Sequence, residues 1–397
     1  MPSDAASLSR WCLTTGFLAR EPAALLSGFV AQARARGVPI DRLMVTLRTL
    51  HPQLSAVGWF WEEGRDFTER QYRQVSTGLE AFMASPVRPL LEGTATRIHV
   101  PTTPEHYDRY PIVRDLGERG FTDYLALAVI AGDGRPNVLT LATRAPGGFT
   151  AAHIDTLDEV MPALGAVLDR NAVRIIAHNI CTTYIGPSTG QRVWQGVIQR
   201  GEVEALRAAV WFSDLRSFTA RTASLGARDT VALLNQWFGV VGEAVEAEGG
   251  EILKFIGDAA LVVFPVLDGD DRDACRRALS SARRTRAGVG SVETPDGRPI
   301  EFGVGLSLGE VAYGNIGAPQ RLDFTVIGDT VNLAARLEGL CSALGEPVLA
   351  DPAFADAVAL PMHPLGPHPL KGLSTPVEVF RPCATPPSPE ASPQAAD

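Results

Sequence analysis

The sequence predicts an α/β (α+β) protein with two folded domains. The chain has 397 residues, of which 45% are hydrophobic. It is therefore longer than one ordinary domain and can bury more than one core. Short apolar runs typical of strands alternate with longer segments whose apolar residues recur at helical spacing. A stretch rich in Pro, Ala and Ser at 383–397 predicts a disordered tail.

Composition excludes several classes of protein. The net charge of -9 comes from interspersed acidic and basic residues, without a long basic tract that could follow a phosphate backbone, so we expect no nucleic-acid partner. Five widely spaced cysteines indicate neither a disulfide framework nor a zinc site. Apolar stretches such as 124–131 are shorter than the roughly 20 residues that span a bilayer, and a signal-peptide pattern is lacking. We expect a cytoplasmic protein with no membrane partner.

The first half of the chain predicts a mixed α/β domain. Residues 21–37 have the spacing of an amphipathic helix, and residues 41–50 begin a sheet with the apolar run LMVTL. Two further apolar runs, 124–129 and 138–143, flank Gly132-Asp133-Gly134 and predict a β-hairpin with a short loop.

These elements, the phrase PGGFT at 146–150 and a long helix expected at about 151–178 together resemble a GAF-type sensor domain. The resemblance implies a regulatory domain over residues 1–180 and a small-molecule effector. Residues 181–205 contain several glycine breaks and predict a structured connector. Five aromatic side chains either line a ligand pocket or belong to a core: Trp59, Trp61, Tyr107, Tyr110 and Phe121.

The second half begins with a buried strand at 208–213 that ends next to Asp214, so this carboxylate is expected to face a crevice. A polar loop at 216–219 leads to a helix at about 228–248, and backbone amides before that helix can hold phosphates. The apolar positions expected to repeat along the helix are Val231, Leu234, Phe238, Val241 and Val245.

A second carboxylate belongs to a predicted hairpin. Strands at 251–256 and 259–264 flank Gly257-Asp258, a pair suited to a tight turn. We expect the first of these strands to lie beside the strand that ends at Asp214, which brings the two carboxylates together. Two such acids repel unless a cation binds, and Mg²⁺ is usually held by one or two carboxylates plus substrate phosphates. The alternative is that Asp214 caps a helix and Asp258 serves only the turn.

Three blocks of sequence then carry a family resemblance: FSDLRSFT at 212–219, KFIGD at 254–258 and FTVIGDTVNLAAR at 324–336. Together they resemble the successive signature blocks of class III adenylyl and guanylyl cyclases, over about 208–381. The resemblance implies a catalytic domain at 206–382 with phosphorus-oxygen lyase activity. Further elements, a helix at 271–288 and strands at 300–308 and 377–380, complete the order expected of a ferredoxin-like core with additions.

The resemblance also implies roles for individual residues. Asp214 and Asp258 match the metal-binding aspartates, with the backbone carbonyl of Leu215 as a further ligand, and two Mg²⁺ or Mn²⁺ ions are expected per site. Asn332 and Arg336 match the pair that orients the ribose and stabilises charge on the α-phosphate, and their i, i+4 spacing puts both on one helix face. The remaining residues expected to bind substrate are Phe218 and Thr219 in the loop before the helix and Lys371, which matches a contact to the β- and γ-phosphates.

Lys254 and Thr325 match the two positions by which the family distinguishes adenine from guanine. A lysine with threonine resembles the adenylyl cyclases of subgroup IIIb, so ATP is the expected substrate and cyclic AMP the product. A lysine donor and a hydroxyl can serve the ring nitrogen and the exocyclic amine of adenine. Several members of the subgroup respond to bicarbonate, which makes bicarbonate regulation a hypothesis here.

In the resembled family, the aspartates of one protomer face the Lys, Asn and Arg of the other, so a homodimer with two shared sites is expected. Three other functions are weighed against the adenylate cyclase. A guanylate cyclase is the nearest, and a nucleotide-binding module with a decayed active site is another. A diguanylate cyclase is prompted by Gly249-Gly250-Glu251, but these residues precede a strand and that interpretation leaves Asn332 and Arg336 unexplained.

Overall fold

A computed structural model describes residues 3–48, 54–73, 83–130, 132 and 134–383. The chain divides into two compact units, Met1–Ile180 and Cys181–Asp397, and each is treated by itself. Among the helices of the described residues, none combines the length and the apolar character needed to cross a membrane. Residues 384–397 of the tail predicted at 383–397, and Asp133 of the predicted turn, lie outside the described residues.

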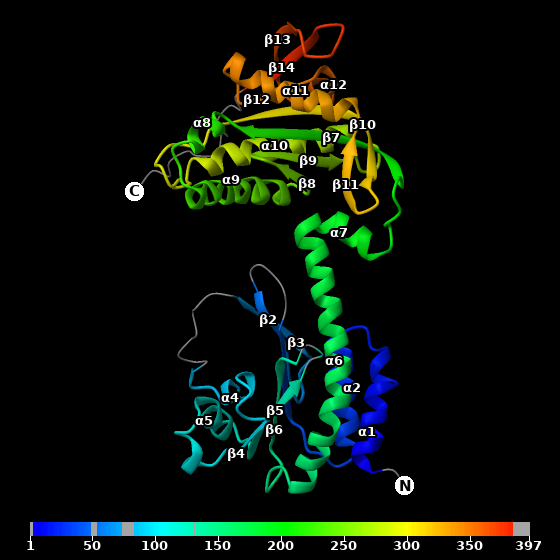
Figure 1. Ribbon diagram of the computed structural model, residues 1–397, viewed down its shortest axis with the longest axis vertical. Coiled ribbons are helices and arrows are strands. Elements are labelled where there is room, and N and C mark those ends of the chain that lie inside the picture. Colours follow the sequence, from blue (N-terminus) through cyan, green and yellow to red (C-terminus); the bar gives the residue numbers. More distant parts are fainter. Residues whose placement is uncertain (1–2, 49–53, 74–82, 131, 133, 384–397) are drawn as a thin grey trace, which may run out of the picture. The chain divides into compact units, whose positions relative to one another are not determined.

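The first unit contains a six-stranded antiparallel sheet with the order β3-β2-β1-β6-β5-β4. Figure 1 labels β2 to β6 of this sheet. The pairing of β5 with β6 confirms the predicted hairpin strands. The strands are β1 (Arg42–Arg48), β2 (Leu54–Glu62), β3 (Thr68–Arg73), β4 (Arg97–Pro101), β5 (Asp123–Ile130) and β6 (Pro136–Thr143). The helices are α1 (Asp4–Leu13), α2 (Pro22–Arg34), α4 (Arg88–Leu91), α5 (Pro111–Glu118) and α6 (Ala151–Ile185).

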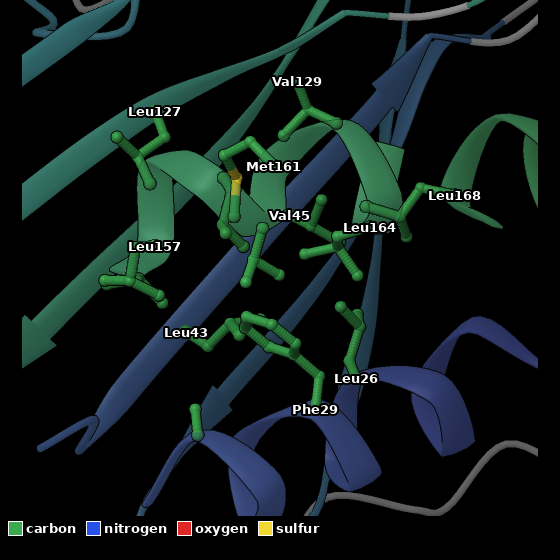
Figure 2. Packing of buried hydrophobic residues seen from close by; sticks show 14 of the residues in the cluster. Leu26, Phe29, Leu43, Val45, Leu127, Val129, Leu157, Met161, Leu164 and Leu168 are labelled. Carbon is green, nitrogen blue, oxygen red and sulfur yellow. The ribbon is translucent and has the colours of Figure 1, made fainter. Parts of the chain in front are cut away.

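Alternation along β1 divides the core of this unit between the two faces of the sheet. Leu43 and Val45 point toward Phe29 of α2 and Leu164 of α6, as Figure 2 shows. The opposite face packs against α4 and α5 through a smaller cluster that includes Tyr124. The predicted helix at 151–178 is found but continues to Ile185, where Gly186 takes a positive φ of 98°.

The aromatic residues weighed from the sequence are divided between these cores. Trp59 is buried on the face covered by α2 and α6, where Trp61 packs at its edge and stacks on Phe67. Phe121 is buried on the other face. For these three side chains the core interpretation is the correct one.

The second unit contains an eight-stranded sheet with the order β13-β14-β12-β10-β7-β9-β8, and β11 pairs with β10. The strands are β7 (Val203–Leu215), β8 (Glu251–Ile256), β9 (Ala259–Pro265), β10 (Phe302–Ala318), β11 (Arg321–Ile327), β12 (Val348–Ala350), β13 (Met362–His368) and β14 (Val377–Pro382). The helices are α7 (Pro187–Trp194), α8 (Phe218–Thr222), α9 (Ala227–Ala247), α10 (Asp271–Val289), α11 (Asp329–Leu344) and α12 (Pro352–Ala357).

Helices cover both faces of this sheet. On β7, Ala209 and Trp211 pack with the buried sides of α9 and α10, whereas Ala208 and Val210 lie on the face that α11 covers. Gly305 of β10 permits the close approach of α11, because a Cβ there would lie 1.9 Å from the carbonyl oxygen of Ala334. The succession β7-α9-β8-β9-α10-β10 is the β-α-β-β-α-β order of ferredoxin-like folds.

Two sequence predictions for this unit are wrong. The strand beside β7 is β9, the second strand of the hairpin, and not β8. The reason is burial: β9 is apolar and almost wholly buried, as a central strand requires, whereas β8 carries Lys254 and exposed side chains suited to an edge. On α9, Val231 is 56% exposed, because the buried face runs through Leu233 and Trp237 instead.

Candidate active site

The carboxyl groups of Asp214 and Asp258 lie next to each other. Asp214 lies near the end of β7, and Asp258 lies in the turn between β8 and β9, where Gly257 takes a φ of 67°. The β7–β9 register pairs Ser213 with Ala260, so the hairpin turn comes directly beside the end of β7. The structure therefore brings together the two carboxylates that the sequence pointed to, through β9.

This contact changes the protonation of the pair. The pKa of Asp214 is raised to about 7, first by burial and then by the neighbouring Asp258 carboxylate, with a smaller contribution from Glu338. The backbone N–H of Leu215 donates to Oδ1 of Asp214 at 3.0 Å and opposes the rise. A carboxylate whose proton affinity is raised by a neighbouring carboxylate forms a site where a divalent cation can replace the proton.

The donor set fits a magnesium or manganese ion. Asp214 and Asp258 supply carboxylate oxygens and Leu215 a backbone carbonyl, and Mg²⁺ commonly uses one or two carboxylates while keeping waters or substrate phosphates. Within the described ranges, no group of three or more His, Cys, Asp or Glu side chains could hold a metal. A cation at this pair thus leaves coordination positions for a phosphate ligand.

Two residues that the sequence reasoning missed support the pair. The indole Nε1 of the fully buried Trp237 donates to the backbone carbonyl of Asp258 at 2.9 Å, so α9 holds the turn in place. Glu338 of α11 has a raised pKa, caused first by burial and also by Asp258, while Arg216 opposes the rise. The sequence does contain a signal for Glu338. It shares one face of α11 with the buried Ala334 and Cys341, and a charged residue at helical spacing among apolar ones is unusual.

The raised pKa gives a testable pH dependence for the metal-free protein. Because Asp214 binds its proton more tightly when folded, its stabilising contribution is full at low pH and is lost as pH rises through about 7. Between pH 6 and 8 we expect the free energy of unfolding to fall by about 1 kcal/mol, or roughly 2–4 °C in Tm. Thermal unfolding in EDTA should show this fall in the wild type and not in Asp214→Asn. An equal fall in both proteins would contradict the assignment.

The two residues predicted to select the base lie on neighbouring segments of one edge. Nζ of Lys254 on β8 lies 3.4 Å from Oδ2 of Asp323 on β11. Thr325 is two residues further along β11, and its buried Oγ1 has no hydrogen-bond partner in the part of the chain that the structure describes. Lys254 and Asp323 line a cavity of about 1090 Å³. Asp323 was not predicted, although its i, i+2 spacing from Thr325 places both on one face of the strand.

The predicted phosphate and ribose contacts gather on α11 and the turn before β14. Asn332 is exposed and Arg336 is half-buried. A Cβ at Gly372 would lie 3.3 Å from Nη2 of Arg336, so this guanidinium borders the turn that carries the exposed Lys371. The structure gives none of these three side chains a hydrogen bond or ion pair with another described residue. Phe218 and Thr219 begin α8, with Phe218 packed partly against the core.

The site residues of one chain fall into two groups on opposite sides of α11. Glu338 faces the aspartate pair of its own chain. Arg336 precedes it by two residues, or about 200° around the helix, and therefore points away from that pair. Asn332 lies four residues before Arg336 on the same helix face, so it also points away from the aspartate pair. Within the described residues, no hydrogen bond or ion pair joins the aspartates to Asn332, Arg336 or Lys371.

The connector is anchored to the strand that carries Lys254. In α7, the backbone N–H and Oγ1 of Thr189 donate to Oε1 of Glu251 at 3.0 and 2.9 Å. Tyr313 on β10 donates to the same carboxylate. Residues 182–188 line the cavity that Lys254 and Asp323 also line. The residues after α6 are thus part of the second unit.

Part of the second unit matches a known protein family. Residues 203–345 match the family model of the adenylate and guanylate cyclase catalytic domain. This segment is a class III adenylyl/guanylyl cyclase catalytic domain.

Several relatives carry the name adenylate cyclase. Adenylate cyclase 1 of Rhizobium meliloti is 33% identical over 198 residues, which are 48% of this chain and 28% of the relative. Adenylate cyclase of Anabaena cylindrica is 34% identical over 157 residues, 38% of this chain and 31% of the relative. The chain therefore spans less than a third of each relative. Among solved structures, the adenylyl cyclase CyaB from P. aeruginosa aligns over 47% of this chain and 98% of that chain, with 26% identity and a TM-score of 0.41.

Proposed function

We propose that this cyclase catalytic domain makes the chain an adenylate cyclase, which converts ATP to 3′,5′-cyclic AMP and pyrophosphate at sites shared by two copies. The observation that carries the proposal is the contact between Asp214 and Asp258. A half-buried carboxylate pair beside a backbone carbonyl is suited to cations that bring a triphosphate. A nucleotide-binding module with a decayed active site would have no need to keep two carboxylates that repel each other.

In the proposed reaction, the 3′-oxygen of ATP forms a bond to the α-phosphorus while the bond from that phosphorus to the β-phosphate oxygen breaks. The hydroxyl proton is lost and pyrophosphate leaves. Mg²⁺ or Mn²⁺ ions held by Asp214, Asp258 and Leu215 would supply charge neutralisation and acidify the hydroxyl. Asn332 orients the ribose, and Arg336 stabilises the charge that develops on the α-phosphate. Lys371 and the first amides of α8, at Phe218 and Thr219, bind the outer phosphates.

The proposed shared site follows from the direction of α11. Since Arg336 and Asn332 point away from the aspartates of their own chain, they are suited to complete a site on a second chain. Exposed apolar side chains near the β8 edge support an interface there, with Phe255 and Ile256 each 49% exposed. Val231 on α9 adds to the exposed apolar surface of this unit. A homodimer would cover these groups and form two equivalent sites.

Residues 1–180 are proposed to be a GAF-like regulatory domain. The support is the antiparallel sheet with helices on both faces, followed by α6 and the connector that is bonded to Glu251. An effector in this domain would act on the strand that carries Lys254. Bicarbonate regulation stays a prediction of the subgroup resemblance, and it fails if replacing chloride with bicarbonate at fixed pH leaves the cyclase rate unchanged.

The preference for ATP over GTP is proposed to depend on Lys254 and Thr325, with Asp323 holding the lysine at 3.4 Å. The unpartnered hydroxyl of Thr325 is available to adenine. We expect the wild type to use ATP at least about tenfold better than GTP, measured as kcat/KM, because one lost base contact is worth 1–3 kcal/mol.

Lys254→Glu combined with Thr325→Cys should reduce or reverse that ratio without changing the oligomeric state. Arg272→Glu, a charge reversal at an exposed position of α10, is the matched control and should leave the ratio unchanged. A wild-type preference for GTP would favour the guanylate cyclase alternative. An unchanged ratio in the double variant would show that these residues do not select the base.

A further inference from the structure

The sheet of the first unit has a cavity of about 680 Å³ on the face that α4 and α5 cover. Its volume is in the range of small-molecule sites. The lining comes from five strands, β1, β2, β3, β5 and β6, and from the two short helices, so most of it is built on a paired sheet. The helix-covered core shown in Figure 2 lies on the other side of β1 and does not contribute.

Arg42 is the unusual residue of this cavity. It is 6% exposed, and its Nε and Nη1 have no hydrogen-bond partner among the described residues. Its guanidinium lies 4.9 Å from the ring centre of Phe60, which satisfies none of its N–H groups. A buried and unpaired cation costs several kcal/mol unless a partner is supplied. A buried guanidinium with unsatisfied N–H groups is expected where a bound ligand supplies the missing hydrogen-bond acceptors.

The carboxylate that stands opposite Arg42 already pairs with two other arginines. Glu62 stands opposite Arg42 in the β1–β2 register. Its two oxygens, however, accept hydrogen bonds from Arg119 and, at 2.8 Å, from Arg144. Burial lowers the pKa of the Arg42 guanidinium, and Arg119 and Arg70 lower it further, whereas Tyr124 and Glu62 raise it. Because both oxygens of Glu62 are already paired with other guanidiniums, an anion from outside would find unsatisfied donors on Arg42.

The other residues that line the cavity indicate the chemical character of the rest of the ligand. Met44, Leu91, Ile112 and Val138 present apolar side chains to the cavity, and Tyr72 and Tyr124 contribute rings with hydroxyls. The lining has two further charged residues, and both are exposed: Arg48, and Glu92, whose carboxylate accepts from Nε of Arg88 at 2.7 Å. One buried guanidinium in an apolar cavity matches one negative charge on an apolar body better than it matches a multiply charged phosphate.

We propose that this cavity binds a small organic carboxylate with an apolar body, whose carboxylate pairs with the guanidinium of Arg42. The site is separate from the proposed catalytic chemistry, and binding to it is measurable whether or not the chain makes a cyclic nucleotide. It gives the regulatory domain an effector of defined chemical class.

Calorimetric titration of the full chain tests the proposal with two acids, octanoate and 4-phenylbutanoate, and their matched alcohols. We expect at least one acid to bind saturably and at least about tenfold more tightly than its alcohol. Arg42→Met keeps an unbranched apolar stem and removes the charged guanidinium, and it should weaken acid binding at least tenfold. Because it also removes an unpaired buried charge, it should raise the thermal midpoint of the ligand-free protein.

Two further variants separate recognition from folding. Arg70→Met removes the other guanidinium stacked on Phe60, at 4.6 Å, without altering the lining, so acid binding should persist. Ala56→Leu adds volume inside the cavity and should weaken the acid and the alcohol together. Failure of both acids to bind, equal affinity for acid and alcohol, or full binding by Arg42→Met would each overturn the proposal.

Discussion

Asp258→Ala is expected to lower the cyclase rate by at least about 10³-fold, because it removes one of the two carboxylates that would hold the catalytic cations. The fold should survive, since Trp237 is bonded to the backbone carbonyl of Asp258 and that bond is kept in the variant. The variant should also lose affinity for Mn²⁺, as measured by the electron paramagnetic resonance signal of the free ion.

The matched control is Asp356→Ala, which removes an exposed aspartate from α12. It should leave both the rate and the affinity for Mn²⁺ unchanged. If Asp258→Ala kept the wild-type rate and bound Mn²⁺ as tightly, the assignment of the aspartate pair as the metal site would be wrong.

Mixing two inactive variants should restore activity. Arg336→Ala lacks the guanidinium that points away from its own aspartates, and Asp258→Ala lacks a metal ligand. Random exchange of subunits in an equal mixture makes about half of the dimers mixed, and each mixed dimer has one intact site and one doubly altered site. The expected activity is therefore about one quarter of the wild-type value, measured after subunit exchange at a protein concentration where dimers are confirmed.

A mixture of Asp258→Ala with Asp214→Ala is the matched control, since both changes lie in the same half of the site and no dimer then contains an intact site. It should stay inactive. No rescue in the first mixture, with mixed dimers demonstrated, would mean that the aspartates and Arg336 act within one chain.

Local sequence patterns predicted much of the second unit. The Gly257-Asp258 turn, the helix from Ala227 to Ala247 and the helix that begins at Asp329 are found where glycine, periodicity and apolar runs indicated them. These features depend on neighbouring residues, so they can be predicted without knowledge of the tertiary fold. The contact between Asp214 and Asp258 was predicted by placing a hairpin beside a strand, although the wrong strand of the hairpin was chosen.

The features that could not be predicted depend on partners that are distant in the sequence. Trp237 has the pattern of a core residue, and only the fold shows that its indole bonds to Asp258. Helical spacing predicted Val231 as an apolar position of α9, but contact with the sheet buries Leu233 instead. Arg42 lies in an apolar run typical of a strand, and its missing partner becomes apparent only when Glu62 is seen to be occupied.

Product identification tests the central claim most directly. The full chain is incubated with equimolar ATP and GTP and Mn²⁺, and the nucleotide products are identified by mass. The account predicts 3′,5′-cyclic AMP as the main product, formed in equal amount with pyrophosphate and absent with Asp258→Ala. The formation of only linear nucleotides, or of no nucleotide product by a dimeric and folded protein, would contradict it.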